Sequence, residues 1–178
     1  MANQQSVILA GGCFWCTEAV FLPLKGIGRV ESGYIGGEES TANYDAVCSG
    51  RTGHAEAIRV TFDPDIISLA QIYDIFFATH DPTQLNRQGN DIGTQYRSAL
   101  FPFDGAQKAE ADAAIGRANE IWDGKVVTTI EPDAPFYVAE GYHQNYFARN
   151  PGNPYCLAVA APKVAKVRQS YGALLKDA

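Results

Sequence analysis

Two cysteines three positions apart flank a pair of large aromatic residues in the segment AGGCFWCTEAV (10–20). Such a Cys-x-x-Cys pair can be a redox couple, half of a zinc site or two small core residues. The first cysteine, Cys13, follows an apolar run and two glycines, which predicts a turn from a strand into a helix at this point. Unpaired N–H groups and the helix dipole lower the pKa of a thiol at such a position, so we expect Cys13 to be a reactive thiolate.

The aromatic residues between the cysteines favour chemistry over a purely structural role. Phe14 and Trp15 stand beside the thiol rather than at core spacing, and the polar first turn of a helix is a poor place to bury them. We interpret them as the wall of an apolar pocket that receives a substrate group.

A zinc site is another interpretation of the cysteine pair, and a structural zinc ion requires four ligands. The other possible ligands are scattered singly along the chain: Cys48, Cys156, His54, His80 and His143. Because no second pair of closely spaced ligands follows, the sequence favours a redox or nucleophilic thiol and no metal.

A carboxyl group on the apolar side of a predicted strand is the second candidate. The segment HAEAIRVTFDP alternates so that Glu56 shares a face with Ile58 and Val60. Burial raises the pKa of a carboxyl group, and a carboxylic acid that stays protonated near neutral pH can act as a general acid. The alternation leaves open a second interpretation, in which Glu56 lies at the rim of the sheet and pairs with a lysine or arginine.

Loop regions carry further polar candidates. The polar segment 81–95 contains Asp91 and is followed by Tyr96, and loops of that length in a compact domain are usually functional. Tyr44 lies in the segment upstream of the predicted strand. A tyrosine hydroxyl group on a loop can bind an oxygen atom of a polar substrate, although most single tyrosines only pack. Cys156 lies in the segment NPGNPYC, which predicts either a mobile thiol that can reach another cysteine or an exposed loop thiol.

Charge and composition argue against several classes of function. The net charge of −6 is unfavourable for binding nucleic acid or an anionic membrane. No stretch approaches the roughly 20 apolar residues that span a membrane, and the N-terminus lacks the features of a signal peptide. We therefore expect one domain over residues 1–178 in the cytoplasm, where cysteines are more often reactive than joined in structural disulfides.

Apolar periodicity predicts a chain in which strands and helices are interleaved. The expected strands cover 6–10, 28–37, 54–64, 96–101 and 125–132, with a further strand after Cys156. The expected helices cover 13–22, 69–80, 105–122, 140–150 and 161–175, with Ser68 and Asp104 as N-caps. This order indicates an α+β fold with long functional loops.

The chain as a whole resembles a known family, the A-type peptide-methionine sulfoxide reductases. The segments that carry the resemblance are GGCFWCTEAVF (11–21), SGYIGG (32–37), NYDAVCSGRTGHAE (43–56), FDP (62–64), HDPTQLNRQGNDIGTQYRSALF (80–101) and FYVAEGYHQNYFARNP (136–151). The resemblance implies a two-layer α/β sandwich around a ferredoxin-like mixed sheet. It also implies reduction of methionine S-sulfoxide, free or in proteins, by a monomer that needs no cofactor beyond an external thiol reductant, thioredoxin.

The resemblance implies a role for each matched position around the thiol. Cys13 would attack the sulfoxide sulfur, while Phe14 and Trp15 would hold the terminal methyl group of the substrate. Glu56 would protonate the sulfoxide oxygen. Attack at sulfur is feasible only when the oxygen is protonated, so this assignment agrees with the interpretation of Glu56 as an acid.

The remaining implied roles concern the oxygen and the second thiol. Tyr44 and Tyr96 would donate hydrogen bonds to the sulfoxide oxygen, and Asp91 would support the site through water or backbone contacts. A second thiol would then condense with the sulfenic acid. Many relatives have glycine at position 16 and use a cysteine in a C-terminal tail, which Cys156 resembles. Cys16, one helical turn from the nucleophile, is the alternative, and we favour Cys156.

Two other functions remain open at this stage. A thiol–disulfide oxidoreductase would use the cysteine pair on proteins, but disulfide exchange needs no general acid such as Glu56. A binding module for zinc or for methionine side chains would show no turnover at all.

Overall fold

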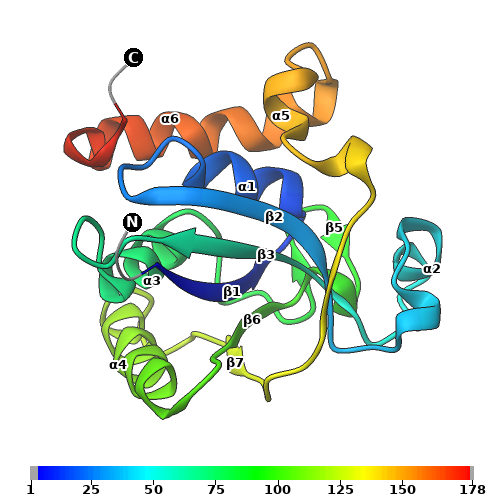
Figure 1. Ribbon diagram of the computed structural model, residues 1–178, viewed down its shortest axis with the longest axis horizontal. Coiled ribbons are helices and arrows are strands. Elements are labelled where there is room, and N and C mark those ends of the chain that lie inside the picture. Colours follow the sequence, from blue (N-terminus) through cyan, green and yellow to red (C-terminus); the bar gives the residue numbers. More distant parts are fainter. Residues whose placement is uncertain (1–3, 177–178) are drawn as a thin grey trace.

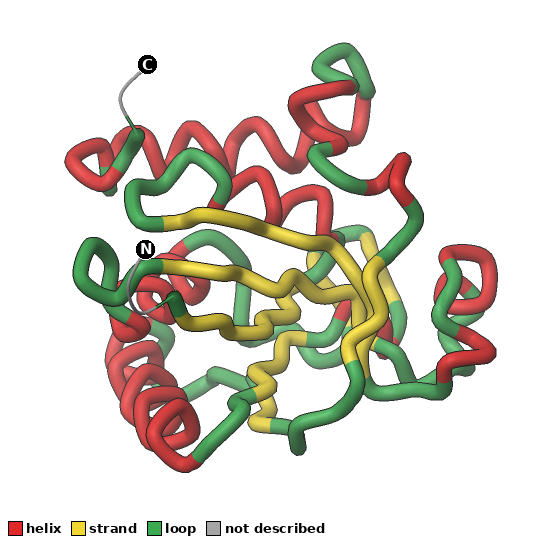
Figure 2. The backbone as a smooth tube through the Cα atoms, in the orientation of Figure 1, coloured by secondary structure: helices red, strands yellow, loops and turns green. Residues whose placement is uncertain are grey.

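A six-stranded mixed sheet forms the centre of the structure, a computed structural model that describes residues 4–176 (Figures 1 and 2). The strands lie in the order β7-β6-β1-β3-β2-β8, in which β6 and β7 are parallel and the other neighbours are antiparallel. Their bounds are β1 (Gln5–Gly11), β2 (Ile27–Ile35), β3 (Ala55–Phe62), β6 (Ser98–Phe101), β7 (Thr129–Ile130) and β8 (Phe136–Val138). Two short strands, β4 (Arg87–Gln88) and β5 (Asp91–Ile92), pair in a separate hairpin.

Most of the predicted helices are confirmed. The α-helices are α1 (Phe14–Phe21), α2 (Tyr44–Cys48), α3 (Leu69–Ala78), α4 (Gly105–Ile121), α5 (Tyr146–Arg149) and α6 (Ala161–Ser170). Short 3-10 turns cover Glu39–Thr41, Thr94–Tyr96, Gly141–His143 and Gly172–Leu174, and a π-helical turn covers Cys156–Ala160. Ser68 and Asp104 each accept a hydrogen bond from a backbone amide in the first turn of α3 and α4, as predicted. None of the helices within residues 4–176 is long and apolar enough to cross a membrane.

The long helices cover one face of the sheet, which confirms the expected α+β arrangement in two layers. Alternate residues of β1 separate the faces, because Val7 and Leu9 belong to the main core whereas Ile8 and Ala10 face the other way. The helical part of the main core comes mostly from α1, α3, α4 and α6, with one residue from α2: Phe14, Val20, Phe21, Val47, Ile72, Tyr73, Ile75, Phe76, Phe77, Ala111, Ala114, Ala118 and Val167. The short helix α2 lies beyond the ends of β2 and β3 (Figure 1), and its Val47 is buried in the main core.

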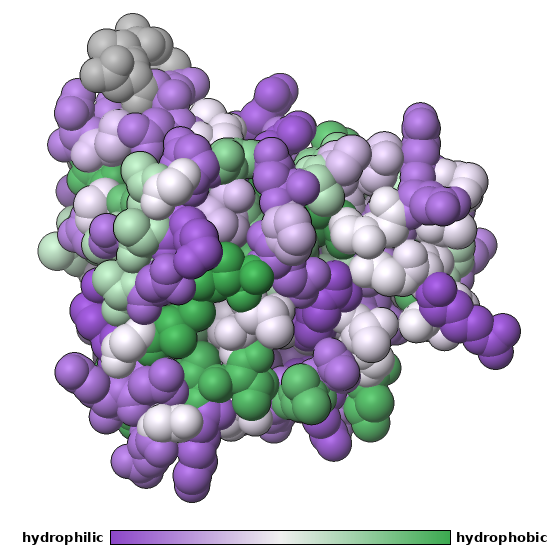
Figure 3. Space-filling model, turned by 90° about the horizontal axis from the view of Figure 1, so that it is seen from below, coloured by the Kyte–Doolittle hydropathy of each residue, from purple (hydrophilic) through white to green (hydrophobic). Residues whose placement is uncertain are grey.

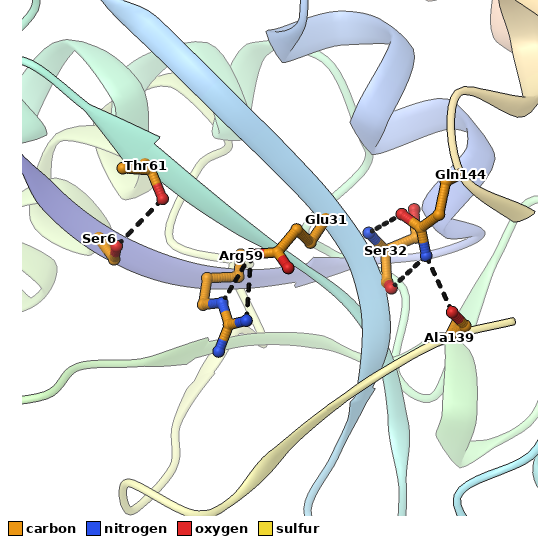
Figure 4. Close-up of polar contacts among 7 residues, drawn as sticks. All are labelled: Ser6, Glu31, Ser32, Arg59, Thr61, Ala139 and Gln144. Atoms are coloured by element: carbon orange, nitrogen blue, oxygen red, sulfur yellow. Dashed lines mark hydrogen bonds and ion pairs between the residues drawn. The ribbon is translucent and has the colours of Figure 1, made fainter. Parts of the chain in front are cut away.

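The opposite face of the sheet has a thinner cover. The chain between β7 and β8 runs across it, and Ala134 and Phe136 pack there against buried strand residues (Figure 1). Glu31 and Arg59 form an ion pair of 3.0 Å across β2 and β3 (Figure 4). Seen from below, the molecule shows apolar side chains gathered between hydrophilic margins (Figure 3).

Three local predictions are wrong. The strand expected over 125–132 is limited to β7, because only two of its residues pair with β6, at Ala99 and Leu100. The helix expected over 140–150 is broken, since Asn145 adopts a left-handed conformation with φ of 54°. The strand expected after Cys156 is instead a helical turn that continues into α6, so this apolar run packs as part of a helix.

Candidate active site

The two glycines before Cys13 bring its thiol to the end of the central strand β1. Gly12 has φ of +97°, and a side chain there would also meet Gln88 at 2.8 Å, so only glycine fits this turn. Cys13 is the N-cap residue of α1, but its side chain makes no capping hydrogen bond. Cys13 is half-buried.

The prediction that Cys13 has a lowered pKa is wrong. Burial, a hydrogen bond shared with Cys16 and the charge of Glu56 raise the pKa of Cys13, and together they outweigh the backbone hydrogen bond that lowers it. The same shared hydrogen bond lowers the pKa of Cys16. The resting protein therefore holds Cys13 as a thiol rather than a thiolate.

Glu56 lies beside this thiol, inside the protein. Its side chain is 1% exposed, and Oε1 accepts a hydrogen bond of 3.2 Å from the backbone amide of Phe14. Burial raises the pKa of Glu56 to about 8, and the charge of Asp91 acts in the same direction. Among the described residues no lysine or arginine pairs with Glu56, which removes the interpretation as a rim residue. The carboxyl group of Glu56 is thus protonated at neutral pH. Its hydrogen-bond partner is the amide of the residue that follows the candidate nucleophile, Cys13.

The two aromatic residues after Cys13 lie in different environments. Phe14 is fully buried in the main core, with its ring centroid 5.6 Å from that of Tyr34, so the expectation that the first turn of the helix would not bury it is wrong. Trp15 is half-buried and stacks on Tyr146 at a centroid distance of 3.8 Å with an interplanar angle of 6°. Tyr146 therefore covers one face of the Trp15 ring, and Trp15, unlike Phe14, keeps part of its surface exposed.

Tyr44 and Tyr96 approach the site from two different loops. Tyr44 begins α2, and Tyr96 ends the 3-10 turn that follows the β4–β5 hairpin. Burial raises the pKa of each hydroxyl group; Cys48 contributes next for Tyr44 and Glu56 next for Tyr96, and Cys13 raises both. Both hydroxyl groups therefore remain protonated and can donate a hydrogen bond near the thiol and the carboxyl group.

Asp91 contacts a residue that the sequence analysis did not single out. Its carboxylate accepts a short hydrogen bond from the hydroxyl group of Tyr155, the residue before Cys156. The Sγ atom of Cys16 lies 3.8 Å from the same hydroxyl oxygen, within reach of a weak hydrogen bond. Through Tyr155, Asp91 is therefore linked to Cys16, the second thiol of the cysteine pair.

The expectation of a mobile or exposed Cys156 is wrong. Cys156 is 0% exposed and packs with Cys16 and Ala160 in a small cluster, with Cys13 at its edge. The π-helical turn before α6 holds it there. Cys48 lies on α2 and is exposed, and it contributes to the raised pKa of Tyr44 and of Tyr96. Within residues 4–176, no group of three or more histidine, cysteine or acidic side chains can hold a metal ion.

Several residues of this site were missed from the sequence. His143, Tyr146 and Tyr155 surround Trp15, and buried Glu18 accepts a hydrogen bond from the amide of Tyr146 at 3.3 Å. The segment GYHQNYFARNPGNPY is rich in tyrosine and contains a histidine, and this composition could have indicated a functional site. The prediction of one regular helix over 140–150 led us to overlook it.

Comparison with known proteins identifies relatives along almost the whole chain. The profile of a family described as peptide methionine sulfoxide reductase matches residues 5–174. Two curated relatives carry the name peptide methionine sulfoxide reductase MsrA. The protein from Clavibacter michiganensis is 58% identical, over 98% of this chain and 100% of its own length. The protein from Deinococcus radiodurans is 57% identical, over 98% of this chain and 86% of its own length.

Solved structures give the same result. Mxr1 from Saccharomyces cerevisiae in reduced form matches with a TM-score of 0.81 and 40% identity, over 85% of this chain and 88% of that chain. Methionine sulfoxide reductase A of Corynebacterium diphtheriae matches with a TM-score of 0.75 and 30% identity, over 86% and 78% of the two chains. A structure of Mxr1 in complex with Trx2 matches with a TM-score of 0.58 and 29% identity, over 82% and 86%.

The raised pKa of Cys13 can be tested by alkylation. In a Cys48→Ser variant, we expect the rate of Cys13 alkylation by iodoacetamide to rise with a midpoint well above the ordinary thiol pKa of about 8.5. Adding Glu56→Gln removes a negative charge and should lower that midpoint. Mass spectrometry of the alkylated peptide gives the rate at each pH. A midpoint below 8.5 in the first variant would contradict the burial argument.

Proposed function

Because the chain belongs to the peptide methionine sulfoxide reductase family, we propose how its own residues divide the reduction of methionine sulfoxide to methionine. Cys13 is the nucleophile and Glu56 is the general acid. The observation that carries this assignment is the buried hydrogen bond between Glu56 and the amide of Phe14, because it holds a protonated carboxyl group beside the thiol.

The first step transfers oxygen from the substrate to Cys13. The sulfur of Cys13 attacks the sulfoxide sulfur while Glu56 gives its proton to the sulfoxide oxygen. The thiol proton replaces the proton on Glu56, so no proton enters from outside. The sulfur–oxygen bond of the substrate breaks, and a new sulfur–oxygen bond forms on Cys13. Cys13 is thereby oxidised to a sulfenic acid, and the sulfoxide is reduced to a thioether.

The remaining pocket residues orient the sulfoxide. Tyr44 and Tyr96 donate hydrogen bonds to the oxygen, which carries partial negative charge in the bound sulfoxide. Trp15 contacts the methyl group of the substrate, and the buried ring of Phe14 supports the pocket from the core. Asp91 acts through its hydrogen bond with Tyr155, whose hydroxyl group lies near the thiol of Cys16.

We propose that Cys16 condenses with the sulfenic acid first. The two thiols lie one helical turn apart, pack in one cluster and are close enough to shift each other's pKa, whereas Cys156 is held in a helical turn. Condensation joins the sulfurs of Cys13 and Cys16 and releases water. Cys156 can then take over the bond to Cys16 by thiol–disulfide exchange, which frees Cys13. This order differs from the sequence-based preference for Cys156.

Thioredoxin is the proposed source of the two electrons that reopen the disulfide. The similar Mxr1 has been crystallised in complex with Trx2, which supports a thioredoxin-type reductant for this chain. Because thiols carry all the electrons, the proposed cycle needs no bound cofactor or metal. The S epimer as substrate, a monomeric state, a single domain over 1–178 and a cytoplasmic location stay predictions of the sequence.

Turnover of separated epimers tests the assignment of the reaction. With dithiothreitol as reductant, the protein should reduce the S epimer of N-acetyl-methionine sulfoxide and leave the R epimer unchanged. Cys13→Ser should lose all measurable turnover because the proposed nucleophile is absent, and Cys48→Ser, which removes an exposed thiol, should keep full turnover as the matched control. Turnover that survives in Cys13→Ser would refute the nucleophile, and absence of turnover in the unmodified protein would favour thiol–disulfide exchange as its activity.

Disulfide mapping tests the order of the thiols. After one equivalent of substrate without reductant, Cys156→Ser should still form a disulfide between Cys13 and Cys16 at an undiminished rate. Cys16→Ser should accumulate sulfenic acid, which a dimedone label detects by mass. A disulfide between Cys13 and Cys156 that forms equally fast in Cys16→Ser would show that Cys156 resolves the intermediate directly.

A further inference from the structure

Three segments that carry proposed site residues meet at the side chain of Arg97. They are the loop that leads to Tyr44, the residues just before Glu56 and the turn that ends at Tyr96. We propose that Arg97 is a positioning residue, which fixes the hydroxyl group of Tyr96 relative to the acid and does not itself touch the substrate. The inference rests on the proposed hydrogen bond from Tyr96 to the sulfoxide oxygen.

The guanidinium group of Arg97 makes four hydrogen bonds within the protein. Nη1 donates to the carbonyl oxygen of Thr94 at 2.9 Å, and Nη2 donates to the carbonyl oxygen of Gly53 at 3.1 Å. Nε and Nη2 also donate to the two carboxylate oxygens of Glu131, at 2.7 and 2.9 Å. Only 15% of the arginine side chain is exposed, so the group is largely enclosed. Arginine suits this position because its planar group presents several N–H donors in a fixed arrangement.

Glu131 gives the guanidinium group a fixed anchor at the edge of the sheet. Glu131 directly follows β7, and its backbone amide donates to the carbonyl oxygen of Leu100 in β6 at 2.9 Å. Burial raises the pKa of Glu131, but the hydrogen bond and the charge of Arg97 outweigh burial and lower the pKa overall. A hydrogen bond of 2.9 Å from the hydroxyl group of Thr129 acts in the same direction. The pair of Arg97 and Glu131 is therefore bidentate and ionised at neutral pH.

Tyr96 is held less firmly by its own backbone than Glu56 is. Glu56 lies in β3, whose pairing with β2 includes this position, whereas Tyr96 ends a 3-10 turn of three residues. Both the backbone amide and the guanidinium group of Arg97 donate to the carbonyl oxygen of Thr94, the first residue of that turn, at 3.2 and 2.9 Å. Gly53, the other carbonyl acceptor, lies three residues before Glu56. The guanidinium group therefore connects the turn of the tyrosine with the start of the strand that carries the acid.

The loop between β2 and α2 crosses the same guanidinium group. Gly36, its first residue, has φ of +107°, and a Cβ atom there would lie 3.0 Å from Nη2 of Arg97. The same atom would lie 2.9 Å from the carbonyl oxygen of Gly53, which accepts a hydrogen bond from Nη2. Only glycine therefore allows this loop, which leads to Tyr44 at the start of α2, to approach Arg97 so closely.

A double-mutant cycle on the full chain tests the role of Arg97. In a single turnover of the S epimer of N-acetyl-methionine sulfoxide without reductant, Arg97→Lys should slow methionine formation at saturating substrate about tenfold. Lysine keeps the charge but loses the planar fork that bonds the carboxylate and both carbonyl oxygens at once. In a Tyr96→Phe background, which lacks the hydroxyl group that Arg97 positions, the same substitution should change the rate by less than about twofold.

The pH profile separates positioning from general support of the fold. The rate should fall as pH rises through about 8 in Arg97→Lys as in the unmodified protein, because the sheet holds Glu56 independently of Arg97. A variant in which the site merely loosens would let water reach the carboxyl group of Glu56. The pKa of Glu56, and with it the midpoint of the profile, would then move toward its ordinary value.

Two further variants supply a second test and a matched control. Glu131→Gln weakens the anchor but leaves Arg97 its bonds to both carbonyl oxygens, so it should slow the reaction about threefold, again only when Tyr96 is present. This variant tests the same contact if Arg97→Lys is unstable. Arg59→Lys changes the arginine whose ion pair with Glu31, also of 3.0 Å, lies across β2 and β3 (Figure 4), and it should leave the rate unchanged.

Equal slowing in both backgrounds, or a lowered midpoint in Arg97→Lys, would overturn the inference. An unchanged rate in Tyr96→Phe would refute the proposed role of Tyr96 and the inference together. Methionine formation by the unmodified protein is measured alongside as the separate test of the proposed function. If the unmodified protein forms methionine and the two substitutions act additively, only the role of Arg97 fails.

Discussion

A carboxyl group buried on the helical face of the sheet, next to the first amide of α1, is the constraint on which the site depends. Glu56 shares its face of β3 with Ile58 and Val60, so an ionised carboxylate there would be costly. Glu56 avoids this cost because it keeps its proton up to about pH 8. The amide of Phe14 is its hydrogen-bond partner, which fixes the acid relative to the residue that precedes that amide, Cys13.

The same burial that makes Glu56 an acid prevents Cys13 from being a strong nucleophile at rest. Both groups are protonated, and the helix N-terminus does not reverse this for the thiol. A thiol that stays protonated without substrate is less exposed to oxidation by other agents, since the thiolate is the reactive form. The neighbouring thiol, Cys16, has the lowered pKa and is therefore the better prepared partner for the step that follows.

The sequence predicts the parts of the site that depend on local order. The run from β1 through two glycines places Cys13 at a helix start, and strict alternation in β3 identifies Glu56 as a residue of the apolar face. Local order does not reveal desolvation, which is why the pKa of Cys13 was predicted in the wrong direction. Nor does it reveal long-range contacts: Gln144 interrupts the expected helix because it binds the backbone of β2, and Cys156 is buried because α1 lies against its turn.

The central claim is that Glu56 supplies the proton for the oxygen, and the pH dependence of a single turnover tests it most directly. With the S epimer saturating and no reductant, the rate of methionine formation should fall as pH rises through about 8, where Glu56 loses its proton. Glu56→Gln should be slower by about 100-fold or more and should lack that transition, because an amide cannot act as the acid. A Glu56→Gln variant with an unchanged rate and an unchanged pH profile would contradict the account.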